Sequence, residues 1–167
     1  HLAGGGVALS LGSHWKAVRV DSRGRVTSSL STLSGELIHA VRTQTILASA
    51  VPGDGPPHLP GDWLEAGLQR ARADGLPRAL YCVRLLDQRA ASTPLDRLAF
   101  LVGATIGADV ATLLPTSTDE SRRVVLLGAA ALVEAWEAVA RRRGLEPLTL
   151  SEEDREAAFR AGCLAVL

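Results

Sequence analysis

Residues 7–32 read VALSLGSHWKAVRVDSRGRVTSSLST, and this stretch decides the fold. It holds a short apolar run to Leu11, an alternating Val-rich run over 15–21, and a polar run over 26–32. Runs of this length and composition, separated by glycine-containing turns, predict strands. Gly24 can take the positive φ that a tight turn requires. We therefore expect consecutive antiparallel strands, the last of them half exposed.

The chain after residue 33 is mostly helical. Ser34 is expected to cap a helix that continues through Ile46, and a loop rich in Pro and Gly follows over 51–60. Asp62 and Glu65 resemble a capping box that opens the next helix.

Glycine and proline mark two further helices. Gly75 is expected to end the helix that begins near residue 62, and Pro77 can start the next one. Thr93, Pro94 and Asp96 form a strong helix start, with an N-cap, a proline at the first helical position and a carboxylate at the third. We expect that helix to extend to about residue 114.

The last third alternates between strands and helices. Residues 124–127 predict a buried strand, 129–143 a helix, and 146–150 a short strand. Ser151 and Asp154 resemble a capping box for the last helix.

The order is therefore three strands, a helix, extra helices, and then strand, helix, strand, helix. A meander followed by alternating helices and strands is typical of the ribonuclease-H-like fold, two copies of which make an actin-like ATPase. We expect an α/β domain with a mixed five-stranded sheet and helices on both faces.

The length of 167 residues fits one domain, and 47% of them are apolar, enough for a core. The 18 basic and 18 acidic residues balance, so charge gives no argument for nucleic acid or a membrane surface. No apolar run reaches the ~18 residues that a membrane span needs. Two cysteines without metal-ligand spacing favour a reduced, cytoplasmic compartment.

Gly12, Ser13, His14 and Lys16 lie in or beside the turn that joins the first two strands. Backbone N–H groups of such a turn can converge on an anion, while Ser13 adds a hydroxyl donor and Lys16 a positive charge. Lys16 is also the only lysine in the chain, which favours a position that needs a compact point charge. These features suit a phosphate. The alternative is an ordinary hairpin turn with a surface lysine, which the turn alone favours.

Two helix starts are further candidates for a binding site. Gly35 and Glu36 open a helix whose free N–H groups attract anions or hydroxyl-rich ligands, although Glu36 can instead simply complement the helix dipole. Gly128 and Ala129 follow a buried strand and open another helix, an arrangement common on the nucleotide side of α/β folds. A single glycine after a strand is a weak signal by itself.

Gly103 and Gly107 lie four apart in an apolar helix, which favours close packing against another helix over a ligand site. Several chemistries are excluded, because the chain has no nucleophile elbow, zinc-protease motif, P-loop or paired-cysteine metal site. The first strand lacks the acidic residues with which a ribonuclease-H-like nuclease would hold metal ions.

Taken together, the motifs resemble the 2-keto-3-deoxygalactonokinase family. Residues 12–16 resemble its Gly-Thr-His-Ser-Lys stretch, and 32–47 resemble its Thr-Gly-Glu-Leu and Ser-Ile-Leu segment. Residues 82–84 lie where the family has Ser-Val-Arg, 101–109 resemble its Leu-Ser-Gly-Leu-Leu-Ile-Gly-Ala-Glu helix, and 126–128 match its late strand and glycine. The order and spacing agree over essentially the whole chain.

The resemblance implies an ATP- and Mg²⁺-dependent kinase that phosphorylates 2-dehydro-3-deoxy-D-galactonate at its terminal hydroxyl. It places the ATP phosphates at Gly12, Ser13, His14 and Lys16. The catalytic base is not assigned by these motifs.

The resemblance also implies roles for five other residues. Gly35 and Glu36 would face the sugar acid or position Mg²⁺, and Arg84 could pair with the substrate carboxylate. Gly128 and Ala129 would line the nucleoside pocket.

The resemblance covers only the C-terminal half of the family. We expect 1–167 to be a single C-terminal lobe with a helical insertion at about 50–92, and the N-terminal lobe to be absent. Because ligands of such kinases bind between the lobes, this chain alone is expected to be inactive. The sequence departs from the family at Ser13 (Thr), Trp15 (Ser) and Asp109 (Glu), and Trp15 predicts added bulk beside the phosphate turn that weakens catalysis.

The sequence leaves a different class of function open. The chain could be a degenerate actin-fold module without catalysis that acts in binding or assembly, and an exposed inter-lobe face would then favour a homodimer. A kinase of the same fold for another sugar also remains open. A stability shift caused by nucleotide would favour the kinase, whereas self-association without nucleotide binding would favour the module.

Overall fold

A computed structural model of the chain describes residues 2–53, 58–89, 92–115 and 121–166. Its strands are β1 (Gly6–Leu11), β2 (Trp15–Val20), β3 (Val26–Thr32), β4 (Arg123–Gly128) and β5 (Glu146–Thr149). They form one five-stranded sheet in the order β3-β2-β1-β4-β5. β2 pairs antiparallel with β1 and β3, whereas β4 pairs parallel with β1 and β5. The expected meander and mixed sheet are confirmed.

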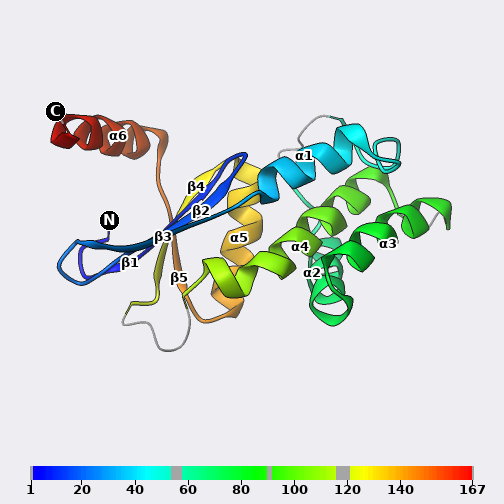
Figure 1. The fold of residues 1–167 in the computed structure, drawn as a ribbon, viewed down its shortest axis with the longest axis horizontal. Helices are drawn as coiled ribbons and strands as arrows, with labels where there is room; N and C mark the ends of the chain where they lie inside the picture. The colour runs from blue at the N-terminus through cyan, green and yellow to red at the C-terminus, as the bar shows by residue number, and fades with distance from the viewer. Residues whose placement is uncertain (1, 54–57, 90–91, 116–120, 167) are drawn as a thin grey trace.

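The described residues form six helices. They are α1 (Ser34–Gln44), α2 (Gly61–Asp74), α3 (Leu76–Gln88), α4 (Pro94–Leu113), α5 (Ala130–Arg142) and α6 (Glu152–Val166). In Figure 1, α4 and α5 lie on one side of the sheet, α2 and α3 pack on α4 further from the strands, and α6 projects away from the other helices after β5. A mixed five-stranded sheet with helices is the α/β fold that the sequence predicted, whereas the described α6 residues are mostly exposed.

The core lies between the sheet and the helices α4 and α5. Val7, Leu9 and Leu11 of β1 are buried on the face toward these helices, and their β4 neighbours Val124 and Leu126 face the same way. Successive strand residues point to opposite faces, so this alternation gives β1 its buried face. Burying one such side chain contributes about 1.5–3 kcal/mol, which makes this row a main source of stability.

Close packing of α2 on α4 depends on glycine. A Cβ at Gly67 would lie 2.0 Å from the Phe100 carbonyl oxygen, and a Cβ at Gly103 would lie 1.9 Å from the Leu64 carbonyl oxygen. Gly107 meets α2 in the same way. Backbones this close leave no room for a side chain, so the expectation that Gly103 and Gly107 serve helix packing is confirmed.

The start of α4 follows the sequence signals. The Thr93 side chain accepts the backbone N–H of Asp96, and the Asp96 carboxylate accepts the backbone N–H of Thr93. This reciprocal capping box satisfies two donors that a helix start otherwise leaves open.

Two other predicted caps are wrong. The N-cap of α1 is Leu33, whose apolar side chain cannot cap the helix, and the Ser34 hydroxyl donates to Asp109 of α4. α1 also ends at Gln44 and does not reach Ile46, which is exposed.

The capping box expected of Asp62 and Glu65 is wrong as well. α2 begins at Gly61 with Pro60 as N-cap and no side-chain cap bond. The Glu65 carboxylate instead pairs with Arg142 of α5 at 2.9 Å. The Glu65 carboxylate therefore pairs with a residue distant in sequence and does not cap the start of α2.

The β2–β3 turn is closed by Asp21. Its carboxylate accepts the backbone N–H groups of Arg23 and Arg25, each at 2.9 Å, and Gly24 has the positive φ of 78° that the sequence predicted. The hydrogen bond from the Arg25 backbone is the main cause that holds the pKa of Asp21 below its ordinary value. The carboxylate therefore stays ionised, which keeps the turn closed.

A buried charge ties the loop after α1 and the end of α3 to α4. The Arg97 side chain donates to the Ala50 carbonyl oxygen at 2.6 Å and to the Ser92 carbonyl oxygen at 2.7 Å. It also pairs with the Asp87 carboxylate at 3.3 Å. A buried guanidinium must be satisfied in this way, so Arg97 fixes these three segments relative to one another.

We expect Gly103→Ala to destabilise the protein by about 2 kcal/mol or more, because its methyl group would overlap the Leu64 carbonyl and push the helices apart. Urea denaturation followed by circular dichroism measures the loss. Gly61→Ala is the matched control, since a Cβ at Gly61 meets open space. Equal stability of the two variants would contradict the close approach of α2 and α4.

Candidate functional site

The β1–β2 turn rests on the first turn of α1. The Glu36 backbone N–H donates to the Ser13 carbonyl oxygen at 2.8 Å, and a Cβ at Gly35 would lie 2.1 Å from the Gly12 carbonyl oxygen. His14 Nε2 and Glu36 Oε1 are 3.1 Å apart, but with 51% and 55% of these side chains exposed, the pair contributes little. The turn is therefore held by backbone contact, which requires glycine at 35.

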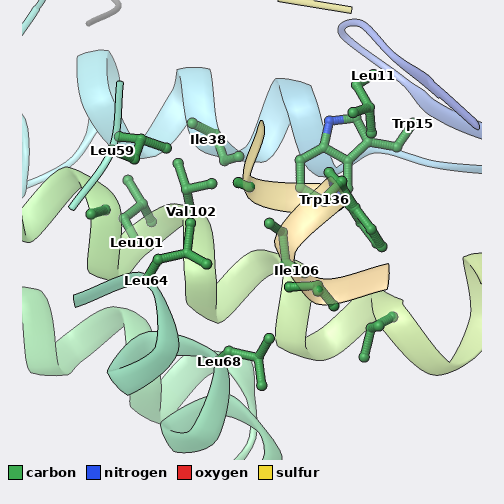
Figure 2. Close-up of a cluster of buried hydrophobic side chains, with 14 of the residues drawn as sticks. Leu11, Trp15, Ile38, Leu59, Leu64, Leu68, Leu101, Val102, Ile106 and Trp136 are labelled. Carbon is green, nitrogen blue, oxygen red and sulfur yellow. The ribbon is translucent and has the colours of Figure 1, made fainter. Parts of the chain in front are cut away.

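A pocket of about 440 Å³ opens beside this contact. The end of β1, one face of α1, the loop before α2, the first half of α4 and the start of α5 form its walls. Its lining residues are Leu11, Gly12, Ser13, Gly35, Glu36, Ile38, His39, Arg42, Leu59, Leu98, Val102, Ala129, Ala131 and Leu132. Figure 2 shows Ile38, Leu59 and Val102 between α1 and α4. A mostly apolar wall with a few polar groups is typical of a small-molecule site.

Two helix N-termini without side-chain caps meet at this pocket. The N-caps are Leu33 for α1 and Ala129 for α5, and neither helix start has a side-chain cap bond. Their first turns contribute Gly35 and Ala131 to the pocket wall. The Glu36 N–H of α1 is already held by the Ser13 carbonyl oxygen, but the other first-turn N–H groups and the positive end of each helix dipole favour an anion. The pocket therefore combines an apolar wall with two positions suited to negative charge.

Neither a dedicated metal centre nor a membrane span is found in the described part of the chain. No group of three or more His, Cys, Asp or Glu side chains there could hold a metal ion. Glu36 supplies the single carboxylate that lines the pocket among the described residues. No described helix is long and apolar enough to cross a membrane.

The family model for 2-keto-3-deoxy-galactonokinase matches residues 1–166. This chain belongs to the 2-keto-3-deoxygalactonokinase family. It is similar to a crystal structure of a candidate 2-dehydro-3-deoxygalactonokinase protein from Sinorhizobium meliloti, with a TM-score of 0.73 and 24% identity. That similarity covers 89% of this chain and 49% of the other, so this chain spans about half its length and the likeness shows the fold. No curated protein matches the chain.

In this family member, the pocket brings together most of the site residues expected from the sequence. Gly12, Ser13, Gly35, Glu36 and Ala129 all line it, although they come from three separate segments. They meet because β1 and β4 are parallel neighbours, so that the turn after one and the helix after the other start at the same edge of the sheet. His14 lies beside them through its contact with Glu36.

Besides His14, three expected site residues do not line the pocket. Lys16 is exposed on β2 and follows the buried Trp15, so its side chain points to the opposite face of the sheet. Arg84 lies on α3, where its guanidinium pairs with Asp87 at 3.1 Å. Gly128 has a φ of 153°, and a Cβ there would lie 2.8 Å from the Leu11 Cβ, so its missing side chain accommodates β1.

Trp15 does not add bulk beside the turn, and that expectation is wrong. Its side chain is fully buried and packs edge-on against Trp136 of α5, with ring centroids 5.4 Å apart. Figure 2 shows the two rings together beneath Leu11. The large residue therefore fills the core under the site.

Sequence reasoning missed several residues of the pocket wall. His39 and Arg42 follow Glu36 on the same face of α1, at the i+3 spacing that places side chains side by side. Arg42 also donates to the Pro52 carbonyl oxygen at 2.9 Å, which holds the loop after α1 near the pocket. The helical period of α1 was the signal that could have identified this face.

We expect Trp15→Ser to destabilise the protein by about 3–5 kcal/mol, because it opens a large cavity against Trp136. Urea denaturation followed by far-ultraviolet circular dichroism measures the change. Trp63→Ser serves as the comparison, since Trp63 is only partly buried and its loss should be smaller. A Trp15→Ser variant as stable as the parent chain would mean that Trp15 is not a core residue.

Proposed function

We propose that this chain is the nucleotide-side half of an ATP-dependent kinase that phosphorylates 2-dehydro-3-deoxy-D-galactonate. One observation carries the proposal: the β1–β2 turn and the N-termini of α1 and α5, neither of which has a side-chain cap, converge on one apolar pocket. A nucleotide has the matching chemistry, because it joins an apolar base to a chain of negative phosphates. Membership in the 2-keto-3-deoxygalactonokinase family supports the same reaction.

The phosphates are assigned to the turn. Ser13 offers an exposed hydroxyl, and the neighbouring backbone can approach an anion closely because Gly12 has open space at its Cβ position. His14 lies at the same rim. Lys16 is included in this assignment as a positive charge on β2. It would attract the phosphates over a distance, without touching them in the pocket.

The nucleoside is assigned to the apolar interior. Ala131 and Leu132 of α5, with the N-cap residue Ala129, line the pocket together with Leu59 and the α4 residues. Small side chains at the start of α5 leave room for a flat ring. A volume of about 440 Å³ lies within the range of about 300–1,000 Å³ usual for sites that hold small molecules.

Mg²⁺ fits this site as a partner of the phosphates. Glu36 is the carboxylate at the pocket, and one carboxylate together with phosphate oxygens and water suits the octahedral demand of Mg²⁺. Bound there, the ion would neutralise charge that develops on the transferred phosphoryl group. Gly35 positions Glu36 by its contact with the turn. The pairing of Arg84 with the substrate carboxylate has no support from the pocket, since Asp87 already holds that guanidinium.

The sugar acid and the rest of the catalytic groups are assigned to a second, N-terminal lobe. Phosphoryl transfer is catalysed mainly by positioning and charge stabilisation, so half of a cleft cannot align both substrates. The chain spans about half the length of the solved structure that it resembles, 49% of it, which agrees with a two-lobed enzyme. We therefore propose that the chain binds nucleotide weakly and has no kinase activity by itself.

Mg²⁺-ATP should raise the thermal midpoint of this chain. At a concentration about ten times Kd the native state gains about 1.4 kcal/mol, which raises the midpoint by about 3–5 °C for a chain of this size. Ala131→Trp should abolish the shift by filling the pocket. Ala111→Trp, an exposed position on α4, is the matched control and should keep it.

A shift that survives Ala131→Trp would place the nucleotide elsewhere. No shift up to about 10 mM, combined with self-association of the chain, would favour a binding or assembly module without catalysis. Lys16→Ala distinguishes a direct phosphate contact, which should remove most of the shift, from a longer-range charge, which should only reduce it in low salt.

A protein that contains both lobes should phosphorylate 2-dehydro-3-deoxy-D-galactonate with ATP in a coupled ADP-release assay. Ala131→Trp should then raise KM for ATP by about tenfold or more, because it blocks the nucleoside position. Unchanged KM for ATP would contradict this assignment of the pocket.

A further inference from the structure

A carboxylate from α4 engages both hydroxyl side chains at the β3–α1 junction. Asp109 Oδ2 accepts a hydrogen bond from the Thr32 hydroxyl at 2.7 Å and another from the Ser34 hydroxyl. The Thr32 and Ser34 hydroxyl oxygens are themselves 2.9 Å apart. Ser34 is 7% exposed, and Thr32 and Asp109 are partly buried, so water competes only partly for these hydrogen bonds.

The cluster sits one residue before the contact that forms the site. Ser34 precedes Gly35, which touches the Gly12 carbonyl, and Glu36, whose N–H donates to the Ser13 carbonyl. A continuous series of contacts therefore runs from Asp109 through Ser34 to the β1–β2 turn. Asp109 itself does not line the pocket.

The start of α1 has no side-chain cap because its N-cap residue, Leu33, carries no hydrogen-bonding side chain. Ser34 is the first helical residue, and its hydroxyl donates to Asp109 of α4. The Glu36 N–H of the same helix turn donates to the Ser13 carbonyl oxygen. The start of α1 is therefore held by α4 on one side and by the β1–β2 turn on the other.

We propose that Asp109 is a positioning residue for the nucleotide site: it anchors the start of α1 through Ser34 and thereby holds the β1–β2 turn in its binding conformation. The effect on ligands rests on the proposed function, whereas the anchoring of the turn does not. Asp109 touches neither substrate nor the reacting atoms in this role.

Amide hydrogen exchange of the ligand-free chain tests the anchoring. In Asp109→Ala, the Glu36 amide should exchange about tenfold faster or more relative to the Leu126 amide of β4, because α1 can now lift from the turn without global unfolding. Asp109→Asn keeps an acceptor oxygen of the same shape and should restore most of the protection. Ser34→Ala removes the same contact from the other side and should reproduce the loss if Asp109→Ala does not fold.

Asp96→Ala is the matched control, since it removes an aspartate from the start of the same helix, far along α4 from Asp109. It should lower protection evenly, leaving the ratio of Glu36 to Leu126 exchange unchanged. An unchanged ratio in both Asp109→Ala and Ser34→Ala would overturn the proposal.

The nucleotide-dependent thermal shift then separates this proposal from the proposed function. Asp109→Ala should lose most of the shift with Mg²⁺-ATP, while Asp109→Asn and Asp96→Ala should keep it. If Asp109→Ala keeps the full shift, the role of Asp109 in ligand binding is overturned. If the parent chain shows no shift, the nucleotide assignment fails, and the exchange ratio still decides whether Asp109 anchors the turn.

Discussion

The position of β1 between an antiparallel and a parallel neighbour is the constraint on which the rest of the structure depends. Both of its edges are hydrogen-bonded, and its Val7, Leu9 and Leu11 side chains are buried against the helices. This fixes where the strand ends. The turn that follows Leu11 and the helix that follows β4 must then start at the same edge of the sheet. The pocket is a consequence of that arrangement, because its walls are the segments that leave this edge.

Local signals predicted most of the fold. The alternation in β1 and β2, the glycine at 24, and the reciprocal cap of Thr93 and Asp96 depend on neighbours in sequence, and they are found as expected. The errors arose where a side chain bonds to a residue distant in sequence and not to the nearby helix start. Glu65 pairs with Arg142 of another helix, and Ser34 turns to Asp109 across the core. A sequence pattern shows which hydrogen-bond or ion-pair partners a side chain could have. The tertiary arrangement determines which of them it meets.

The site was predicted in part for the same reason. Gly12, Ser13, Gly35, Glu36 and Ala129 meet because the topology that the sequence implied brings the ends of their elements together. Lys16 and Arg84 were grouped with them by motif, and their side chains point elsewhere. A motif shows which residue types lie near one another along the chain. It does not show which way each side chain points. Adjacent residues of a strand point to opposite faces of the sheet, so Lys16 and Trp15 lie on different sides. The pairing of Asp109 with Thr32 and Ser34 spans 77 and 75 residues and had no local signature.

The two buried indoles form a natural optical reporter. Trp15 directly follows the β1–β2 turn and Trp136 belongs to α5, so the pair joins two walls of the pocket at a centroid distance of 5.4 Å. Both rings are 0% exposed, and an indole shielded from water emits at shorter wavelength than a hydrated one. Water that enters between the turn and α5 would shift the emission of this pair to the red. With the partly buried Trp63 replaced by phenylalanine, any such entry of water could be followed in time without attaching a dye.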